Sequence, residues 1–366
     1  MKIHIDNQIF RLQRYGGISR YFVRLVEEFD QLGHEPRILG SFHSNAYLRD
    51  LDSRLGSGRY FKKYPKRTIR LFRETGKILD QIQHFSKGAD IIHESYFSEK
   101  PVLRGNQARV ITEYDCMHEI FPYLFPVHQL KTAEKKRAFD RADLILAISH
   151  QTKSDIVEYF DIPEEKIAVT HLAADPKLPD HELISPKTTE RPYFLYVGIR
   201  LPHKNFHSLI LSFAKSKYLL DHFDLVVFSP YSFSSEELAL MEDLGYKPDQ
   251  VRWESGDDRK LYGFYKQAYA FVYPSLYEGF GIPPLEAMRY GCPVVCSNSS
   301  SLPEVVGDAA LTFDPMELDD MKSQMELVAR NESLRNGLIA KGYLRVDEFS
   351  WRKAAEETLA HYSKLL

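Results

Sequence analysis

Apolar residues along this chain follow two alternating patterns. Short apolar runs such as RVITEY at 109–114 fit buried strands, whereas the stretch at 19–32 spaces its large apolar residues at helical intervals. Strands that alternate with helices are typical of parallel α/β units, in which each helix connects two neighbouring strands. The pattern therefore predicts an α/β fold built on parallel sheets.

The alternation occurs twice, and a stretch at 173–192 divides the two halves. This stretch has several prolines and few large apolar residues, which indicates a linker. The expected strands of the first half are 2–6, 36–40, 90–95, 109–114, 144–149 and 166–171. Those of the second half are 192–198, 224–229, 251–255, 270–275 and 293–297. The sequence thus predicts two domains of similar architecture, a number that suits 366 residues.

Composition narrows the class of protein. A hydrophobic content of 43% with 27% charged residues is ordinary for a globular protein, and a net charge of −3 argues against general nucleic-acid binding. The N-terminus lacks the apolar core of a signal peptide, and no apolar run of about 20 residues is present. Three cysteines give no disulfide framework, which suits a reducing compartment. We expect a cytoplasmic protein.

The stretch at 273–306 carries the densest group of chemistry-bearing residues. An expected strand runs into a loop with Gly279 and Gly281, and a helix is expected to start near Pro284. The N-terminus of a helix presents backbone N–H groups that suit an anion such as a diphosphate. Glycines let the backbone approach a ligand closely.

Two glutamates lie at either end of this loop, Glu278 before it and Glu286 in the expected helix. Both can face one pocket, and each carboxylate can accept two hydrogen bonds from adjacent sugar hydroxyls. Glutamates at this spacing mean little by themselves, because a solvated helix often carries them. Their setting in P-S-x-x-E-G-F-G-x-P-x-x-E-A makes them candidates for ligand binding.

This segment resembles the E-x(7)-E signature of retaining glycosyltransferases with the GT-B fold, specifically glycosyltransferase family four. The resemblance implies two Rossmann-like domains that face each other across a cleft. Residues 1–175 would bind the acceptor, residues 176–345 would bind the nucleotide-sugar, and a C-terminal helix in 346–366 would pack back towards the first domain. It also implies that Glu278 contacts the transferred sugar and that Glu286 holds the nucleotide ribose.

The same resemblance supplies further donor-binding candidates. The backbone amides near Phe280, Gly281 and Ile282 would lie against the sugar and the diphosphate, and Leu285 belongs to the helix that follows. Residues 251–268 resemble the nucleobase-binding strand and loop of the family, so the backbone near Trp253 would read the edge of the base.

Two cations follow the expected strand in the stretch at 193–214. The strand ends at Gly198, Arg200 and Lys204 come next, and a helix starts near Asn205. Cations at the carboxyl end of a strand could clamp a diphosphate and stabilise the charge on a departing nucleotide. The pattern resembles the family's G-x-R-x-x-x-K-N element, so the phosphate-binding role passes to Arg200 and Lys204.

The first half offers weaker signals. Gly16 and Gly17 resemble the N-terminal Gly-Gly loop of the family, which approaches the donor phosphates or the acceptor. Many family members carry His-Asp after the strand that corresponds to 109–114, whereas this chain has a tyrosine before Asp115. Asp115 and His118 are therefore catalytic or acceptor-binding candidates, although a single histidine is more often structural.

The resemblance implies a retaining transfer without a bound metal or another cofactor. The sequence fits this, because Arg200, Lys204 and a helix N-terminus would meet the charge of the diphosphate. Metal-dependent glycosyltransferases of the other common fold carry D-x-D after a strand. The D-x-D of this chain, Asp50-Leu51-Asp52, lies in a polar, helix-like stretch.

The substrates are a finer question. The segments DNQIF, RYGGISRYF and YDCMHEIFP resemble bacterial mannosyltransferases that build O-antigen and capsule chains. That resemblance implies GDP-mannose as the donor and a lipid-linked oligosaccharide as the acceptor. A UDP- or dTDP-sugar donor for glucosyl, N-acetylhexosaminyl or rhamnosyl transfer remains an alternative. A sugar-nucleotide 2-epimerase would isomerise its ligand without an acceptor, and a non-catalytic sugar-nucleotide-binding protein would show no turnover.

A basic stretch at 59–77 stands apart from these motifs. The basic excess of residues 1–175 is concentrated there; those residues carry a net charge of +3, against −6 for the remainder. Such a stretch could dock on anionic lipid at the inner face of the plasma membrane, at about 1 kcal/mol per cation. A solvated helix or loop is an equal alternative. The apolar residues interleaved with its eight cations are Phe61, Tyr64, Ile69, Leu71 and Phe72.

Overall fold

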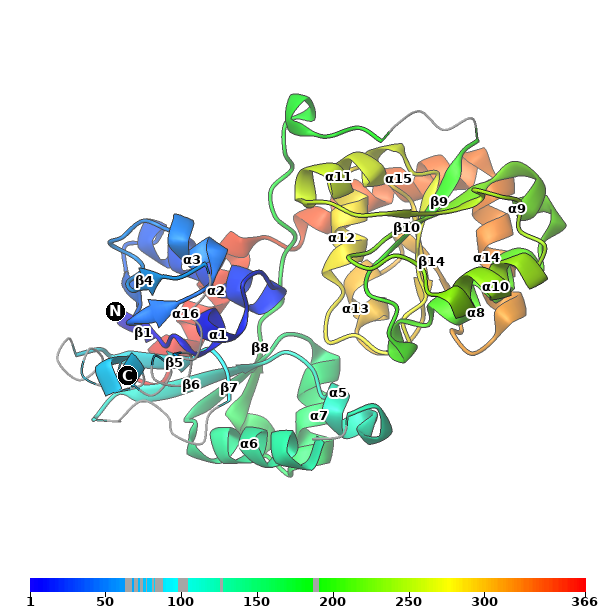
Figure 1. The fold of residues 1–366 in the computed structure, drawn as a ribbon. Helices are drawn as coiled ribbons and strands as arrows, with labels where there is room; N and C mark the ends of the chain where they lie inside the picture. Colours follow the sequence, from blue (N-terminus) through cyan, green and yellow to red (C-terminus); the bar gives the residue numbers. More distant parts are fainter. Residues whose placement is uncertain are drawn as a thin grey trace. The chain divides into compact units, whose positions relative to one another are not determined.

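A computed structural model shows two compact units. One consists of residues 1–172 together with 351–366, and the other of residues 173–350. The structure describes residues 1–62, 68, 72, 75–76, 78–80, 82, 88–97, 105–125, 128–186 and 191–366. Within these residues each unit has a six-stranded sheet in which every strand is parallel to its neighbours (Figure 1). The predicted α/β class with two parallel sheets is confirmed.

The sheet of the N-terminal unit has the strand order β2-β1-β5-β6-β7-β8. Because β2 lies on one side of β1 and β5 on the other, the chain changes direction at β1. Such a switch point is where open α/β sheets bind ligands, outside the carboxyl ends of the strands. The strands are β1 (Lys2–Ile5), β2 (Glu35–Ile38), β5 (Ile91–Glu94), β6 (Ala108–Glu113), β7 (Leu144–Ala147) and β8 (Ile167–Val169).

Helices cover this sheet, and α2 (Gly17–Gln31) shows why they form. Its buried face includes Tyr21, Phe22, Leu25, Val26 and Phe29, the residues that the sequence spaces at helical intervals. The other elements are α1 (Gln8–Leu12), α3 (Ala46–Asp50), α5 (Met117–Ile120), α6 (His128–Arg141), α7 (His150–Phe160), α16 (Trp351–Ser363), the short strands β3 (Phe42–His43) and β4 (Arg59–Tyr60), and the 3-10 turns η1 (Pro122–Leu124) and η2 (Glu164–Lys166).

The sheet of the C-terminal unit has the order β11-β10-β9-β12-β13-β14, so its switch point lies at β9. On its two faces, α12 packs with α11 and α15, and α14 packs with α8 (Figure 1). The strands are β9 (Tyr193–Val197), β10 (Asp224–Phe228), β11 (Val251–Glu254), β12 (Ala270–Tyr273), β13 (Val294–Ser297) and β14 (Ala310–Phe313). The helices are α8 (Phe206–Ala214), α9 (Lys217–His222), α10 (Ser235–Asp243), α11 (Asp258–Gln267), α12 (Ile282–Arg289), α13 (Leu302–Val306), α14 (Leu318–Arg330) and α15 (Glu332–Asp347), with the 3-10 turns η3 (Asp180–Glu182) and η4 (Pro202–Lys204).

The expected linker packs on the C-terminal unit. The N–H of Leu178 donates to the Tyr290 hydroxyl at 3.0 Å, and the N–H of Ile184 donates to the carbonyl of Arg259 at 3.2 Å. Gly263 on α11 faces this strap so closely that a Cβ there would lie 2.2 Å from the Ile184 carbonyl oxygen. The described part of the linker therefore belongs to the second unit, which begins at residue 173.

The terminal helix α16 belongs to the N-terminal unit, where it packs against α2 (Figure 1). His93 on β5 fixes it from within the core. The Tyr362 hydroxyl lies 2.6 Å from Nδ1 of His93, and Nε2 of His93 lies 2.8 Å from the Thr112 hydroxyl. Burial lowers the pKa of His93 to about 3, so the imidazole stays neutral and bridges the helix and the sheet.

No helix in the described ranges is both long enough and apolar enough to cross a lipid bilayer.

We expect the free energy of unfolding of the N-terminal unit to fall as the pH drops from about 6.5 towards 3. In that window the unfolded chain protonates His93 while the folded chain keeps it neutral, so stability is lost at up to about 1.4 kcal/mol per pH unit. Urea unfolding can be followed by fluorescence of the buried Trp351 in a Trp253→Phe background, since the chain has two tryptophans. In His93→Gln, the slope of the free energy of unfolding against pH should correspond to the uptake of one proton fewer on unfolding than in the wild type. In the control His150→Gln, that slope should equal the wild-type slope. Equal slopes for both variants would contradict this account.

Candidate functional site

The switch point of the C-terminal sheet brings together the two most specific predicted residues. Lys204 lies in η4 after β9, and Glu278 lies in the loop after β12, the strand that pairs with β9. The Lys204 ammonium donates to Oε1 of Glu278 at 2.6 Å. The N–H of Leu276 also donates to the carbonyl of His203 at 2.8 Å, so a backbone bond joins the two loops. A carboxylate and an ammonium therefore share the edge of the sheet where a ligand is expected.

The loop that carries Glu278 ends at Gly281, the N-cap of α12. Gly281 has a φ of 119°, and a Cβ there would lie 2.8 Å from the Leu302 side chain, so only glycine fits. The helix then begins with Ile282, Pro283 and Pro284. Because prolines have no N–H, the amides of Gly281 and Ile282 are the ones that this helix start can offer to an anion.

Three consecutive serines after β13 hold this loop from behind. The N–H of Glu278 donates to the Ser300 hydroxyl at 2.9 Å, and the Ser299 hydroxyl donates to the carbonyl of Ser275 at 3.2 Å. The Ser301 hydroxyl lies 2.8 Å from the carbonyl of Glu278 and 2.6 Å from that of Phe280. These serines were not among the predicted site residues, although a serine run between a strand and a helix is a recognisable signal for hydrogen bonds to the backbone.

Glu286 lies on the buried face of α12, with 6% of its surface exposed. Burial and then the Glu286 carboxylate raise the pKa of the fully buried Tyr265. Leu285 and Phe280 are 0% and 3% exposed, so their side chains belong to the core. These two predicted donor-binding residues can therefore offer a ligand only their main chains.

Arg200 binds within its own unit rather than to Glu278. Its guanidinium donates twice to Glu237, at 2.5 and 3.0 Å, and also to the carbonyls of Tyr231 and Ser232, at 2.9 and 2.6 Å. The predicted role of Arg200 as a phosphate ligand therefore requires an exchange of Glu237 for phosphate. Glu237 was not foreseen, although Ser234-x-x-Glu237 is the signature of the capping box that starts α10.

Trp253 holds the other end of the same loop, between β10 and α10. Its indole N–H donates to the carbonyl of Ser229 at 2.9 Å, and 39% of its surface is exposed. The indole edge is therefore occupied, whereas part of the ring remains accessible. Trp253 and Arg200 together fix residues 229–234 at the edge of the sheet that carries Lys204.

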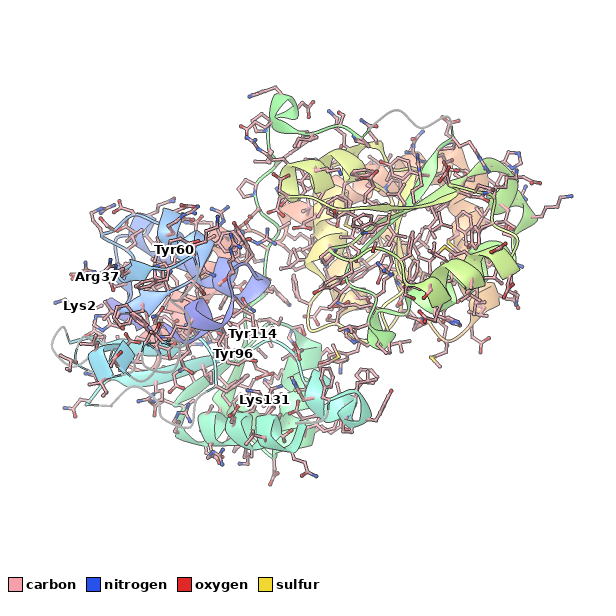
Figure 2. All side chains as sticks on the ribbon, in the orientation of Figure 1. Lys2, Arg37, Tyr60, Tyr96, Tyr114 and Lys131 are labelled. Carbon is pink, nitrogen blue, oxygen red and sulfur yellow. The ribbon has the colours of Figure 1, made fainter. Side chains whose placement is uncertain are left out.

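The N-terminal unit places its predicted residues after β1 and after β6. Gly16 is the N-cap of α2, and a Cβ on Gly17 would meet no atom within 4 Å. Tyr114, labelled in Figure 2, is buried. Its ring packs edge-on against that of Tyr21 on α2, with centroids 5.9 Å apart. The tyrosine that replaces the family's histidine is thus a core residue, and it ties α2 to the turn that begins at Asp115.

Asp115 and His118 share this turn, which includes the short helix α5. Oδ1 of Asp115 accepts the N–H of Met117 at 3.0 Å. The His118 ring lies against Phe125, with centroids 4.5 Å apart. Burial and then the Lys135 ammonium lower the pKa of His118, which keeps its imidazole neutral near pH 7.

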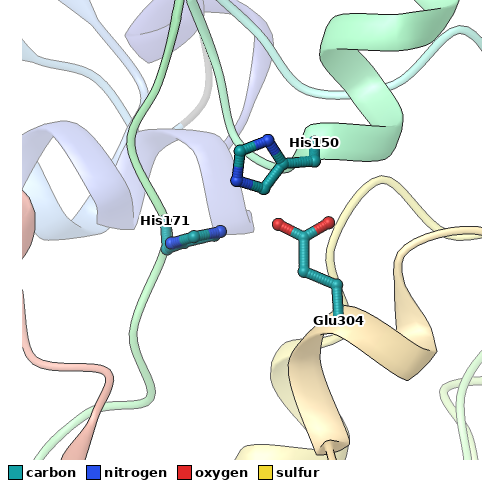
Figure 3. Close-up of side chains that lie close together, drawn as sticks. All are labelled: His150, His171 and Glu304. Carbon is teal, nitrogen blue, oxygen red and sulfur yellow. The ribbon is translucent and has the colours of Figure 1, made fainter.

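Figure 3 shows a further pair of imidazoles in the N-terminal unit, His150 at the start of α7 and His171 after β8. Their ring centroids are 5.8 Å apart. They line a groove of about 570 Å³ between β8, α7 and α16. The third side chain drawn, Glu304, belongs to the C-terminal unit, so it does not complete a ligand set within one unit. Among the described residues, no three potential metal ligands of a single unit lie together.

Two protein families match the chain, one for each half. The family described as "Glycosyltransferase Family 4" matches residues 15–178, and the one described as "Glycosyl transferases group 1" matches residues 180–345. Together they cover nearly all of both units.

Individual relatives agree with these matches. The chain is 32% identical over 273 residues to O-antigen chain mannosyltransferase B of Escherichia coli, which covers 70% of each protein. It is 31% identical to O-antigen chain mannosyltransferase RfbU of Salmonella typhimurium, over 65% of this chain and 64% of that protein. The fold is similar to that of a sucrose-phosphate synthase from Thermosynechococcus elongatus, with a TM-score of 0.76 at 17% identity over 100% of this chain and 98% of that one.

We expect Ser300→Ala to speed amide hydrogen exchange of Glu278 about fivefold, because one hydrogen bond contributes ~1 kcal/mol. Ser300→Gly should give the same acceleration, although glycine relieves the left-handed backbone at this position, where φ is 52°. The control is Ser323→Ala, which removes an exposed serine hydroxyl on α14. An acceleration of similar size in the control would refute the role of the Ser300 hydroxyl.

Proposed function

The chain belongs to glycosyltransferase family 4, and from this premise we propose that this hexosyltransferase moves mannose from GDP-mannose to a lipid-linked oligosaccharide. The proposed transfer retains the configuration of the sugar, needs no metal ion and serves the synthesis of a bacterial surface polysaccharide. Relatives named as O-antigen mannosyltransferases support the sugar and the pathway class.

The observation that carries this proposal is the contact between Lys204 and Glu278 at the switch point of the C-terminal sheet. The Lys204 ammonium lies 2.6 Å from the Glu278 carboxylate. In the proposed complex, a phosphate replaces Glu278 as the partner of Lys204, and a sugar hydroxyl replaces Lys204 as the partner of Glu278. The Lys204 ammonium then faces the diphosphate and stabilises the charge that develops on the departing nucleotide. The Glu278 carboxylate accepts hydrogen bonds from the hydroxyls of the transferred sugar.

Other residues of the same unit complete the proposed donor site. The amides of Gly281 and Ile282 face the diphosphate at the start of α12. Glu286 accepts the two ribose hydroxyls, a task that suits the two oxygens of one carboxylate. Trp253 and the loop that it holds lie at the expected nucleobase end, and Arg200 reaches the diphosphate when it exchanges Glu237 for phosphate.

The N-terminal unit supplies the acceptor side of the proposal. The neutral imidazole of His118 can accept a proton from a sugar hydroxyl, as general-base assistance requires. Asp115, two residues after the end of β6, can orient that hydroxyl. The open space beside Gly17 leaves room for a bulky glycan.

We expect GDP-mannose to raise the melting temperature of the wild type more than UDP-glucose or dTDP-rhamnose does, because a ligand that binds the folded state stabilises it by mass action.

Glu286→Ala should lose about ten- to hundredfold in GDP-mannose affinity, since it removes two hydrogen bonds to the ribose. Glu278→Ala should mainly lose turnover. Thermal shift, calorimetry and product analysis measure these effects.

The matched control is Glu332→Ala, an exposed glutamate in the first turn of α15. It should bind and turn over the donor as the wild type does. Wild-type kinetics in both site variants would overturn the assignment of the two glutamates. Stabilisation by UDP-glucose alone would overturn the mannosyl donor, and isomerisation of the free donor would show an epimerase.

We also propose that the basic stretch at 59–77 docks on anionic lipid, which would place the protein at the inner face of the plasma membrane. Tyr64, Ile69 and Leu71 of that stretch lie outside the described residues. The Phe61 and Phe72 rings pack on Phe42, with ring centroids 5.9 and 5.1 Å away, so these two side chains contribute to packing within the unit.

Three exposed apolar residues lie just after this basic stretch. Ile78, Leu79 and Ile82 are 62%, 42% and 58% exposed. Asp80 between them is buried and accepts the N–H and the hydroxyl of Ser41, both at 2.7 Å. The segment is therefore held by its polar side and turns its apolar side to solvent, which suits insertion between lipid headgroups.

Sedimentation with vesicles that contain anionic phosphatidylglycerol tests the docking. The wild type should sediment, and a variant with glutamine at the eight cations of 59–77 should stay in the supernatant. Ile78→Ser combined with Ile82→Ser should weaken sedimentation, whereas Leu238→Ser, which changes an exposed leucine on α10, should leave it intact. Equal sedimentation of the glutamine variant and the wild type would rule out the docking.

A further inference from the structure

A lysine is buried in the N-terminal unit beneath the turn that carries Asp115 and His118. Lys135 projects from α6, and only 4% of its side chain is exposed. Its ammonium lies over the rings of Phe97 and Phe160, at 5.6 and 6.0 Å. A charged amine in such a setting is costly unless strong hydrogen bonds compensate it.

Three acceptors surround this ammonium. Nζ of Lys135 donates to Oε1 of Glu113 at 2.8 Å, to the carbonyl of Asp115 at 2.6 Å and to Oε2 of Glu119 at 3.1 Å. The Thr132 hydroxyl, from the same helix, donates to Oε1 of Glu119 at 2.6 Å. Burial by itself would lower the pKa of Lys135, but the neighbouring carboxylates outweigh it and raise that pKa, so the ammonium stays charged.

The acceptors lie on both sides of His118. Lys135 binds residue 115 through its carbonyl and residue 119 through its side chain, so it spans the turn from one end to the other. The helix in this turn, α5, has four residues; its N-cap residue Cys116 makes no side-chain cap hydrogen bond, and Oδ1 of Asp115 accepts the N–H of Met117. A helix this short is not stable by itself, because the free-energy cost of nucleation exceeds the stabilisation that the hydrogen bonds of one turn provide.

Other lysines of α6 do not share this position. Lys131, one turn earlier, is 32% exposed; it pairs with Glu134 and lies 5.9 Å over the Tyr96 ring (Figure 2). Lys136 is 42% exposed and pairs with Asp140. Of these three lysines of α6, only Lys135 is buried and bound to three acceptors. Its ammonium therefore contacts the end of β6 and the turn that follows, and not the surface of α6.

We propose that Lys135 is a positioning residue that holds Asp115 and His118 in the geometry that the acceptor requires. This rests on the proposed function, because it takes the turn after β6 as the acceptor side of the reaction. Lys135 contacts neither substrate. It fixes the backbone of residue 115 and anchors α5 through Glu119, at the carboxyl end of a central strand.

The test uses the titration of His118, followed by NMR of the full chain labelled at histidine. Lys135→Met removes a cation near the imidazole, so the pKa of His118 should rise. Glu119→Gln removes a nearby anion, so the pKa of His118 should fall further. Unravelling of the turn would expose His118 in both variants and raise its pKa in both. Opposite shifts therefore show that the turn still forms in both variants, so that faster amide exchange reports the loss of the Lys135 contact and not of the whole turn.

Hydrogen exchange supplies the second readout. The amides of Glu119, Ile120 and Phe121 donate within the turn, and they should exchange about tenfold faster in Lys135→Met. The matched control, Lys136→Met, should change neither the exchange nor the titration. Lys135→Met exchange and titration that equal those of the control would overturn the proposal.

If Lys135→Met does not fold, Glu119→Gln and Thr132→Val decide, since each weakens the same contact at the α5 end. Exchange three- to tenfold faster than in the wild type supports the proposal, and unchanged exchange overturns it. These readouts need no substrate. Failure of GDP-mannose to bind the wild type would therefore remove the proposed donor without touching the result for Lys135.

Discussion

The hydrogen bond between Lys204 and Glu278 depends on one constraint, the order of the strands in a parallel sheet. The chain leaves β9 towards β10 on one side, and it later returns to build β12 on the other side. The loops that follow β9 and β12 therefore emerge side by side at the carboxyl edge, where no crossover helix covers them. Polar side chains that are far apart in the sequence meet there. The serines behind the Glu278 loop and the glycine at the start of α12 keep the carboxylate at that edge.

Buried polar groups join the helices, strands and turns of the N-terminal unit to one another. Glu94 on β5 accepts from Arg109 and Arg141, His93 joins α16 to the sheet, and Lys135 joins α6 to the turn after β6. Each group satisfies its hydrogen bonds inside the protein, since an unpaired buried charge would cost several kcal/mol. Specific polar pairs therefore hold the elements of this unit together in addition to its apolar core. The turn with Asp115 and His118 is held in the same way, by Lys135.

Much of the fold could be predicted because strands and helices leave a direct trace in the sequence. The strands that apolar runs indicated are present within a few residues of their expected ends, and α2 buries the face that its spacing predicted. Lys204 and Glu278 were identified because each belongs to a short segment that resembles a motif of the family, G-x-R-x-x-x-K-N for Lys204 and E-x(7)-E for Glu278. Arg200 shows where this reasoning stops. The sequence predicted a phosphate-binding role for Arg200, but it gave no sign that the guanidinium also binds Glu237 and two carbonyls of another loop.

The sequence by itself determined the fold class, the division into two α/β halves and the family, because periodicity and a compact motif are local properties of the chain. Tertiary structure alone decided which partners those residues have. It paired Lys204 with Glu278, placed three serines behind the Glu278 loop, turned the Leu285 side chain into the core and buried Lys135 beneath Asp115. Contacts of this kind join residues tens of positions apart, and only the packing of helices on a sheet brings them together.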